Sequence, residues 1–160
     1  MACPTRIRAV MAVALAAAGA AAISGCGGGS EEVSAEELVQ KSDQVCGKVQ
    51  ERFVEIQAQP PASSSEGAEQ AGELLGVADD AQAELRDIEP PGELRDRYDA
   101  YLDARESVSD ALERGKRAAE NQDGDAYGKA QEEAARGAPE RQRLARELGF
   151  RACSQSTEAP

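Results

Sequence analysis

Cysteine is the residue type with the widest range of chemistry in this chain, which contains four cysteines and no histidine. The cysteines are Cys3, Cys26, Cys46 and Cys153. A thiol can accept a lipid, form a disulfide or act as a nucleophile, but a catalytic nucleophile usually needs a neighbouring base such as histidine. Without histidine, serine–histidine–aspartate sites, cysteine–histidine sites and most zinc sites are excluded. We therefore predict no catalytic residue and no cofactor.

The residues before Cys26 are typical of a secretory signal peptide. Residues 1–25 begin with the basic Arg6 and Arg8, and an uncharged run follows over residues 9–23. That run is shorter than the roughly 20 apolar residues that a membrane-spanning helix needs. A charged start, a short apolar middle and small residues at the end predict a signal that is removed. Cys3 lies inside it and has no expected structural role.

The last residues of this segment resemble the lipobox of bacterial lipoproteins. They read Ile23, Ser24, Gly25 and then Cys26. In lipoproteins this cysteine receives a diacylglycerol and becomes the first residue after cleavage, and two acyl chains anchor a protein stably. We expect an extracytoplasmic protein held to the cell membrane by lipid on Cys26. The alternative is ordinary cleavage near Ala22, which would release a soluble protein.

The rest of the chain predicts a flexible tether, an all-α domain and a short tail. Residues 27–33 are rich in glycine and form the tether with the lipidated Cys26, residues 34–153 carry helical periodicity, and residues 154–160 should be disordered. Apolar residues at the spacing of one helical face predict helices over about 34–59, 68–88, 94–121 and 125–148. No strand pattern occurs, so we expect an antiparallel bundle of four helices.

Three positions mark the predicted helices in particular. Ser34 with Glu37 forms a capping box at the first helix. The third helix places Arg105 on the same face as Tyr98, Tyr101, Leu102, Val108 and Leu112. Pro139 should kink the fourth helix or split it in two, because proline removes a helical hydrogen bond. Helices this rich in alanine seem poorly suited to enclose an apolar cavity for a small ligand.

Cys46 and Cys153 are the two thiols that remain after Cys26 is lipidated and Cys3 is discarded. Outside the cytoplasm two such thiols usually pair. In an antiparallel bundle with an even number of helices, the last helix ends near the start of the first, so Cys153 can reach back to Cys46. We predict a structural disulfide. The alternatives are a redox-active pair, which would lack the usual C-x-x-C spacing, and free or intermolecular thiols.

Residues 121–132 match part of a calcium-binding loop. Asn121, Asp123, Asp125 and Glu132 fall at four ligand positions of an EF-hand. However, the first position is Asn rather than Asp, and Ala126 stands where the sharp turn requires glycine. We favour a turn in which Asp125 caps the fourth helix, with weak calcium binding as the alternative.

Charge limits the class of partner. Residues 1–25 contain two basic residues and no acidic one, so their removal takes the net charge from −12 to −14. This balance argues against nucleic acid, which needs a basic surface. Five arginines lie within residues 136–151. We expect them to pair with acidic residues on other helices, although they could instead form a patch for an anionic wall polymer.

Several segments together resemble a group of small, uncharacterised actinobacterial lipoproteins. They are the lipobox, the sequence Asp43-Gln44-Val45-Cys46, residues 88–98 (IEPPGELRDRY) and residues 148–153 (LGFRAC). The resemblance implies an all-helical, disulfide-linked lipoprotein and no activity. We expect a non-enzymatic binding or interaction module of the cell envelope, with another envelope protein or wall material as its partner. The alternative is an enzyme or sensor that uses carboxylates or a metal.

Overall fold

A computed structural model describes residues 32–60 and 62–155 of the chain. The predicted signal peptide, the lipobox residues Ile23, Ser24 and Gly25, the lipidation site Cys26 and residues 156–160 of the predicted tail lie outside this part. The described part contains four α-helices and no strand, which confirms the all-α prediction. None of its helices has an apolar stretch long enough to cross a membrane.

The helices are α1 (Ala35–Gln57), α2 (Ser64–Arg86), α3 (Arg95–Glu120) and α4 (Gly124–Glu147), and a 3-10 turn, η1 (Gly92–Leu94), precedes α3. Ser34 caps α1 through the predicted capping box with Glu37, whose carboxylate accepts the Ser34 N–H at 2.9 Å. These hydrogen bonds lower the pKa of Glu37, the bond to the Ser34 backbone most of all. The capping box therefore fixes where the folded domain begins.

Two helix starts differ from their predicted positions because a side-chain cap lies earlier in the sequence. α2 begins at Ser64 rather than near residue 68, since the Ser63 hydroxyl accepts the Glu66 N–H at 3.2 Å. α4 is capped by Asp123 and not by Asp125, because the Asp123 carboxylate accepts the Ala126 N–H at 3.0 Å. Asp125 instead lies in the first turn of α4, where a negative charge favours the helix dipole.

The fourth helix is continuous across Pro139, so the expected division into two helices is wrong. The end of α4 follows the prediction: Gly149 has a φ of 82°, which glycine adopts readily, and Phe150 N–H donates to Ala145 O at 2.9 Å. This bond turns the chain back toward α1. Ser154 and Gln155, which we expected in the disordered tail, belong to a turn in which Gln155 N–H donates to Ala152 O at 3.2 Å.

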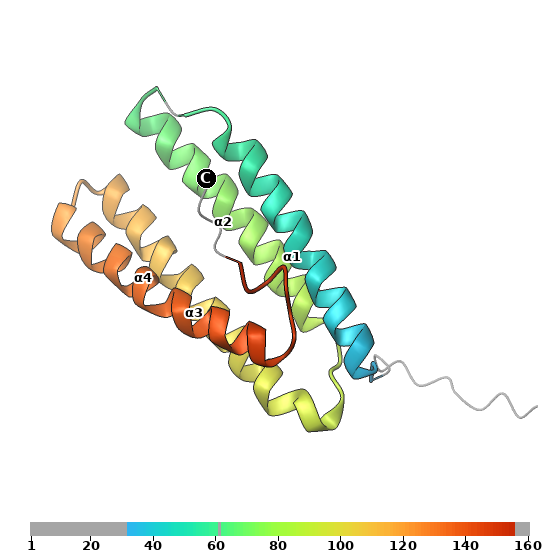
Figure 1. The fold of residues 1–160 in the computed structure, drawn as a ribbon. Helices are drawn as coiled ribbons and strands as arrows, with labels where there is room; N and C mark the ends of the chain where they lie inside the picture. Colours follow the sequence, from blue (N-terminus) through green and yellow to red (C-terminus); the bar gives the residue numbers. More distant parts are fainter. Residues whose placement is uncertain (1–31, 61, 156–160) are drawn as a thin grey trace, which may run out of the picture.

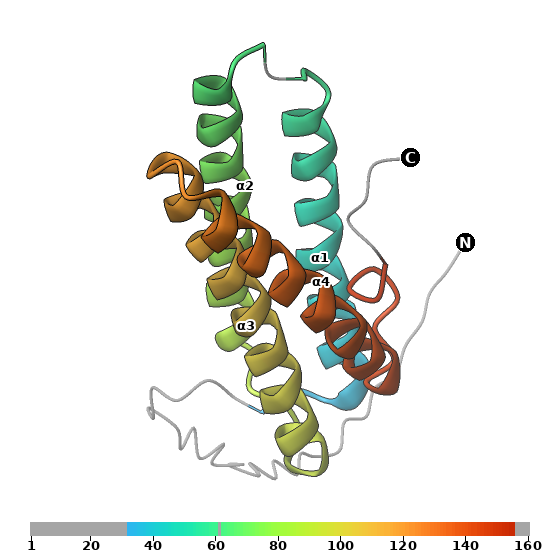
Figure 2. The ribbon, with the colours of Figure 1, turned by 90° about the vertical axis from the view of Figure 1, so that its left-hand side faces the viewer.

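The helices form two antiparallel hairpins, α1–α2 and α3–α4, which lie at an angle to one another (Figure 1 and Figure 2). The hairpins are closest where α2 leads into α3, and they separate toward the turns at residues 58–63 and 121–123 (Figure 1). The segment after α4 lies between α4 and α1 (Figure 1). We call the end where α2 leads into α3 the closed end, and the end with the turns at residues 58–63 and 121–123 the open end.

The hydrophobic core occupies the closed end and the middle of the bundle. Three aromatic rings lie at its centre: Phe150 meets Tyr98 and Tyr101 edge-on, with ring centroids 6.2 Å and 5.4 Å away. The Tyr98 hydroxyl donates to Leu85 O at 2.7 Å, so its buried polar atom is satisfied. Tyr98 and Tyr101 are therefore core residues, as their place on the apolar face of the helix predicts.

Small residues bring α3 and α4 close together along the rest of the bundle. Ala111, Gly115 and Ala118 of α3 are buried, as are Ala130 and Ala134 of α4. A Cβ on Gly115 would lie 3.4 Å from the Ala130 Cβ, and a Cβ on Gly137 would lie 2.8 Å from Val108 Cγ2. Because this hairpin packs through its small residues, its larger apolar side chains are left to face the other hairpin.

Candidate functional site: a cleft between the helical hairpins

A disulfide joins Cys46 of α1 to Cys153 after α4, as predicted. Both cysteines are buried. Asp43, one turn before Cys46, holds the same C-terminal segment: its carboxylate accepts the backbone N–H of Arg151 at 3.0 Å and of Ala152 at 2.8 Å. Gln50 donates from Nε2 to Ala152 O at 2.8 Å. These contacts make the C-terminal segment a fixed part of the bundle, on the side of α1 that faces the other hairpin.

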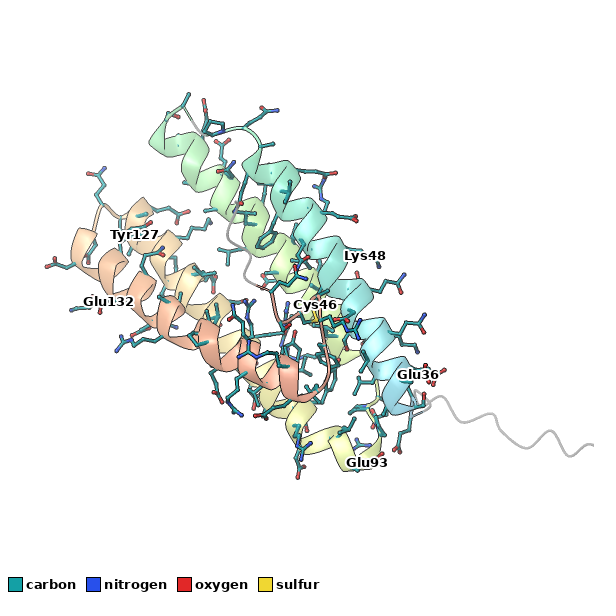
Figure 3. All side chains as sticks on the ribbon, viewed as in Figure 1. Glu36, Cys46, Lys48, Glu93, Tyr127 and Glu132 are labelled. Carbon is teal, nitrogen blue, oxygen red and sulfur yellow. A yellow bond between two sulfur atoms is a disulfide. The ribbon has the colours of Figure 1, made fainter. Side chains whose placement is uncertain are left out.

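Beyond this segment, toward the open end, the hairpins enclose a cleft with an apolar wall. Its outer part has a volume of about 500 Å³ and is lined by apolar and small residues of all four helices, with Gln57, Lys116 and Gln131 among its polar groups. Its largest apolar side chains are Phe53, Leu74, Leu75, Leu112 and Tyr127. Leu112 and Tyr127 are 38% and 43% exposed, and Tyr127 lies near the open end, whereas Cys46 lies at mid-bundle (Figure 3).

We expected no enclosed apolar cavity from helices this rich in alanine, and the described residues form an open apolar cleft instead. Leu74, Leu75 and Leu112 follow the helical periodicity that predicts a core, but they do not close against one another. The hairpins diverge here, and short residues such as Ala71 and Ala78 between the large ones leave space instead of filling it. Helical periodicity identifies a face that is turned inward, but it does not show whether that face is filled.

The inner part of the cleft contains two arginines, Arg105 of α3 and Arg141 of α4. This part has a volume of about 140 Å³ and also reaches Cys46, Cys153 and Gln50. Phe53, Ala78 and Leu112 line both parts, so the inner and outer parts adjoin. The cleft thus combines an apolar outer wall with a cationic inner end.

Arg105 is held in place by neutral groups. Its Nε donates to Gln82 Oε1 at 3.0 Å, one terminal nitrogen donates to the Tyr101 hydroxyl at 3.3 Å, and its guanidinium carbon lies 5.8 Å from the centre of the Tyr101 ring. Gln82 is itself fixed by donating to Leu102 O at 3.0 Å. The orientation of the Arg105 guanidinium is therefore set without a carboxylate.

Arg141 has still fewer partners. Its Nε is buried and has no hydrogen-bond acceptor among the described residues. Desolvation and the nearby positive charge of Arg105 lower the pKa of Arg141, which nevertheless stays charged because an arginine side chain does not lose its proton in proteins. No carboxylate of the described residues lies within 4.0 Å of either guanidinium, although ten ion pairs form elsewhere in that part of the chain.

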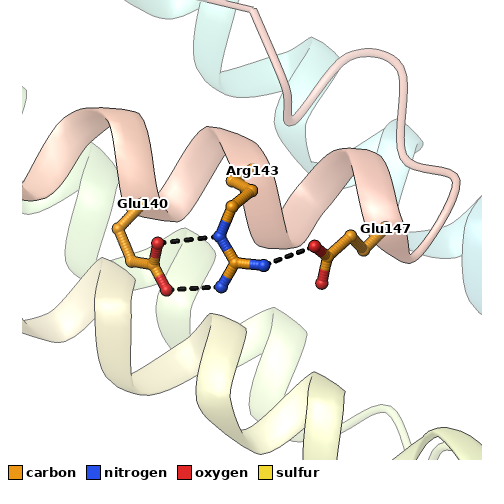
Figure 4. A network of polar contacts seen from close by, with 3 residues as sticks. All are labelled: Glu140, Arg143 and Glu147. Atoms are coloured by element: carbon orange, nitrogen blue, oxygen red, sulfur yellow. Dashed lines mark hydrogen bonds and ion pairs between the residues drawn. The ribbon is translucent and has the colours of Figure 1, made fainter.

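Two of the other arginines expected to pair with different helices, Arg136 and Arg143, pair within α4 instead. Arg143 donates to Glu140 on one side, at 2.9 Å and 2.6 Å, and to Glu147 on the other (Figure 4). These bonds raise the pKa of Arg143 and lower that of Glu140. Arg136 lies 4.0 Å from Glu132, also on α4. The expectation of pairing between helices is wrong for Arg136 and Arg143, because partners three or four residues away on the same helix are closer.

The four residues of the possible calcium loop do not surround a common point. Asn121 donates from Nδ2 to Arg117 O at 2.8 Å, Asp123 caps α4, and Glu132 points away from the bundle on the outer side of α4 (Figure 3). Residues 124–132 are helical and cannot wrap around an ion. Within residues 32–60 and 62–155, no group of three or more Asp, Glu or Cys is placed to hold a metal.

A second hollow, of about 430 Å³, lies at the turn between α1 and α2 and contains several glutamates. Two of these carboxylates already have partners. Glu55 forms an ion pair with Arg52 at 2.5 Å, and Glu66 accepts the Ala62 N–H at 2.8 Å. The acidic side chains here thus contribute to local structure at the turn and the start of α2.

Comparison of the chain with models of known protein families, with curated proteins and with solved structures found no match.

Proposed function

We propose that this chain is a lipid-anchored extracytoplasmic protein that acts by binding, through the cleft between its two hairpins. The observation that carries the proposal is the position of the cleft relative to Glu32, the first described residue of the domain. The described domain begins at Glu32, whose carboxylate accepts the Gly92 N–H at 2.6 Å, and Val33 N–H donates to Glu89 O at 2.9 Å. These bonds tie the start of the domain to the closed end.

A lipid on Cys26 would hold the closed end near the membrane. Residues 26 to 32 span about 20 Å when fully extended. From the closed end, α1 extends over its 23 residues, or about 34 Å at 1.5 Å per residue, to the open end. The outer part of the cleft would then face away from the membrane, toward wall material or other envelope proteins.

The anchor is tested by mass spectrometry of the protein isolated from its native membrane. We expect a mature N-terminus at Cys26 that carries a thioether-linked diacylglycerol. An unmodified N-terminus at another residue would overturn the anchor.

Binding through the cleft is tested by photo-crosslinking in the native envelope. One variant carries a photoreactive side chain at position 75, in the cleft wall, and the control carries it at position 54. Val54 lies on the same hairpin, is 62% exposed and does not line the cleft. Adducts specific to position 75 are expected, whereas equal adducts from both positions would contradict binding in the cleft.

A further inference from the structure

We infer that the cleft binds an anionic amphiphile with one alkyl chain, whose head pairs with Arg105 and Arg141 and whose chain lies along the apolar outer wall. This inference rests on the proposed function, in which the cleft is the binding site, and it adds the chemical class of the ligand.

The head group follows from the two arginines. Arg105 and Arg141 are both partly buried and line the same inner part of the cleft. Two like charges in such a place destabilise a fold unless an opposite charge lies between them. The chain has 30 acidic residues, yet no carboxylate of the described residues pairs with either guanidinium. Planar guanidinium groups favour carboxylate and phosphate, which can accept two parallel hydrogen bonds. Gln82 and Tyr101 hold Arg105 while leaving other N–H groups free to donate to such an anion.

The alkyl chain follows from the outer part of the cleft. Its volume of about 500 Å³ lies within the range of about 300–1,000 Å³ that is typical of small-molecule sites. Leu74, Leu75 and Leu112 supply an apolar wall that continues to the arginines by way of Phe53 and Ala78. Removing this wall from water would provide most of the binding free energy, and the arginines would fix the orientation of the ligand.

Most other classes of ligand would interact either with the arginines or with the apolar wall, but not with both. A small inorganic anion would pair with the arginines but leave the leucine wall in water. A neutral or cationic lipid would cover the wall but leave two guanidiniums unpaired. A peptide segment could do both, but a cleft of about 500 Å³ has the size of a small-molecule site and suits a single alkyl chain better than a peptide segment.

The test is isothermal titration calorimetry with the full-length chain carrying Cys26→Ser, which prevents lipidation and leaves every described residue unchanged. The probes are tetradecanoate and tetradecyl phosphate below their micelle concentrations, which also distinguish a carboxylate from a phosphate head. The matched controls are tetradecyltrimethylammonium, which has the same chain and the opposite charge, and acetate, which is a carboxylate without the chain. At least one anionic probe should bind at a single site, roughly tenfold or more tighter than decanoate, which has four fewer methylene groups. Saturable binding of the cationic control with equal affinity would overturn the inference.

Four variants locate the site. Arg105→Gln and Arg141→Gln should each weaken binding at least about tenfold, the effect of losing one charged hydrogen-bond donor. Arg143→Gln is the control, because it removes the same charge from α4 outside the cleft. Ala78→Leu should fill the junction of the two parts and abolish binding while leaving both arginines in place. Thermal unfolding of each variant shows whether it is folded.

The result also separates this inference from the proposed function. If position 75 yields specific adducts but neither anionic probe binds, the cleft is a binding site and the ligand class proposed here is wrong. If Arg105→Gln, Arg141→Gln and Ala78→Leu all bind the probe as the parent does, the probe lies elsewhere and the inference is also overturned. Binding that depends on Arg105 and Arg141 supports the inference even if Cys26 proves to be unmodified.

Discussion

The carboxylate of Asp43 on α1 accepts the backbone N–H of Ala152, 109 residues further along the chain, at 2.8 Å. The same carboxylate accepts the N–H of Arg151 at 3.0 Å and of Cys153 at 3.5 Å, so one side chain accepts three backbone donors that follow the last helix. This contact lies beside the Cys46–Cys153 disulfide and reinforces the same junction by non-covalent means. The closed part of the bundle therefore depends on two adjacent links between the first helix and the C-terminal segment.

Asp43→Ala should lower the free energy of unfolding by about 2–3 kcal/mol, because backbone donors lose a charged acceptor and Ala152 N–H is partly buried. Asp43→Asn should cost less, about 1 kcal/mol, because the amide oxygen can still accept one bond. Urea denaturation measures both values. The control is Glu51→Gln, which removes one negative charge from the exposed side of the same helix and should leave stability unchanged. If Asp43→Ala is as stable as that control, the contact does not hold the segment.

Removing the disulfide should lower the free energy of unfolding more than Asp43→Ala does. Cys46 and Cys153 are 107 residues apart, and cross-linking a loop of this length stabilises a fold by up to about 4.7 kcal/mol in the chain-entropy model. Cys46→Ala with Cys153→Ala, made in the Cys26→Ser background, should lower the urea midpoint accordingly. Reductant should destabilise the parent and leave the double variant unchanged. Equal stability of the two proteins without reductant would mean that the bond contributes nothing.

The sequence predicted this bond and the helices well, because local signals and chain geometry determine them. Ser34 and Glu37 are spaced for a capping box, and Gly149 lies where a helix needs a left-handed residue. The predicted pairing of Cys46 with Cys153 needed only an even number of antiparallel helices. In contrast, no sequence pattern distinguishes Asp43 from an ordinary surface aspartate, because its partners are backbone N–H groups of a segment far along the chain.

The cleft could be predicted only in part. Arg105 falls on the apolar face of its helix, and a charge in such a position is a sign of a buried or functional role. Arg141 gives no such sign, because it is one of five arginines within residues 136–151 and only the fold brings it close to Arg105. Whether the apolar residues of the two hairpins close against one another depends on the angle between the hairpins. Helical periodicity does not specify that angle.

The α3–α4 packing predicts opposite effects of the same substitution at two glycines of one helix. Gly137→Ala would place a methyl group 2.8 Å from Val108 Cγ2, and a β-branched side chain cannot easily turn away. We expect a loss of about 1–3 kcal/mol from overpacking. A Cβ on Gly128 meets nothing within 4 Å, so Gly128→Ala should gain up to about 1 kcal/mol from helix propensity.

Thermal unfolding of the two variants checks the signs of these effects, and Val108→Ala combined with Gly137→Ala should restore much of the loss. A stabilising Gly137→Ala would show that the hairpin is less tightly packed than the structure indicates.

The buried Tyr98 should make stability fall at alkaline pH. Desolvation raises the pKa of Tyr98 to about 12, whereas the unfolded chain loses this proton near the ordinary value of about 10. The stability that Tyr98 contributes through this pKa difference is therefore complete below about pH 10 and is lost as the pH rises toward about 12. The free energy of unfolding should fall by no more than about 1.4 kcal/mol per pH unit. Urea denaturation from pH 8 to 11.5 measures it.

The comparison needed for Tyr98 is with phenylalanine variants, because other groups also titrate in this range. Tyr98→Phe should be less stable at pH 8, since it loses the bond to Leu85 O, but its stability should decline less above pH 10. Tyr127→Phe, at a largely exposed ring, should follow the parent. Identical alkaline slopes for the parent and Tyr98→Phe would contradict the shifted pKa of Tyr98.

A binding role for Arg141 predicts that the ligand-free protein gains stability when this residue is lost. Arg141 is partly buried, and its buried Nε has no acceptor among the described residues. A charge without a partner in such a place costs free energy, and exchanging buried ionic groups for apolar groups of similar volume is often neutral or stabilising by about 1–4 kcal/mol. Arg141→Met should therefore raise the midpoint of thermal unfolding in the absence of ligand. Arg143→Met, the control on the same helix, breaks the pairs with Glu140 and Glu147 and should not stabilise the fold. If Arg141→Met is instead destabilising by more than this control, Arg141 supports the fold itself and is not held in the cleft at a cost for binding an anion.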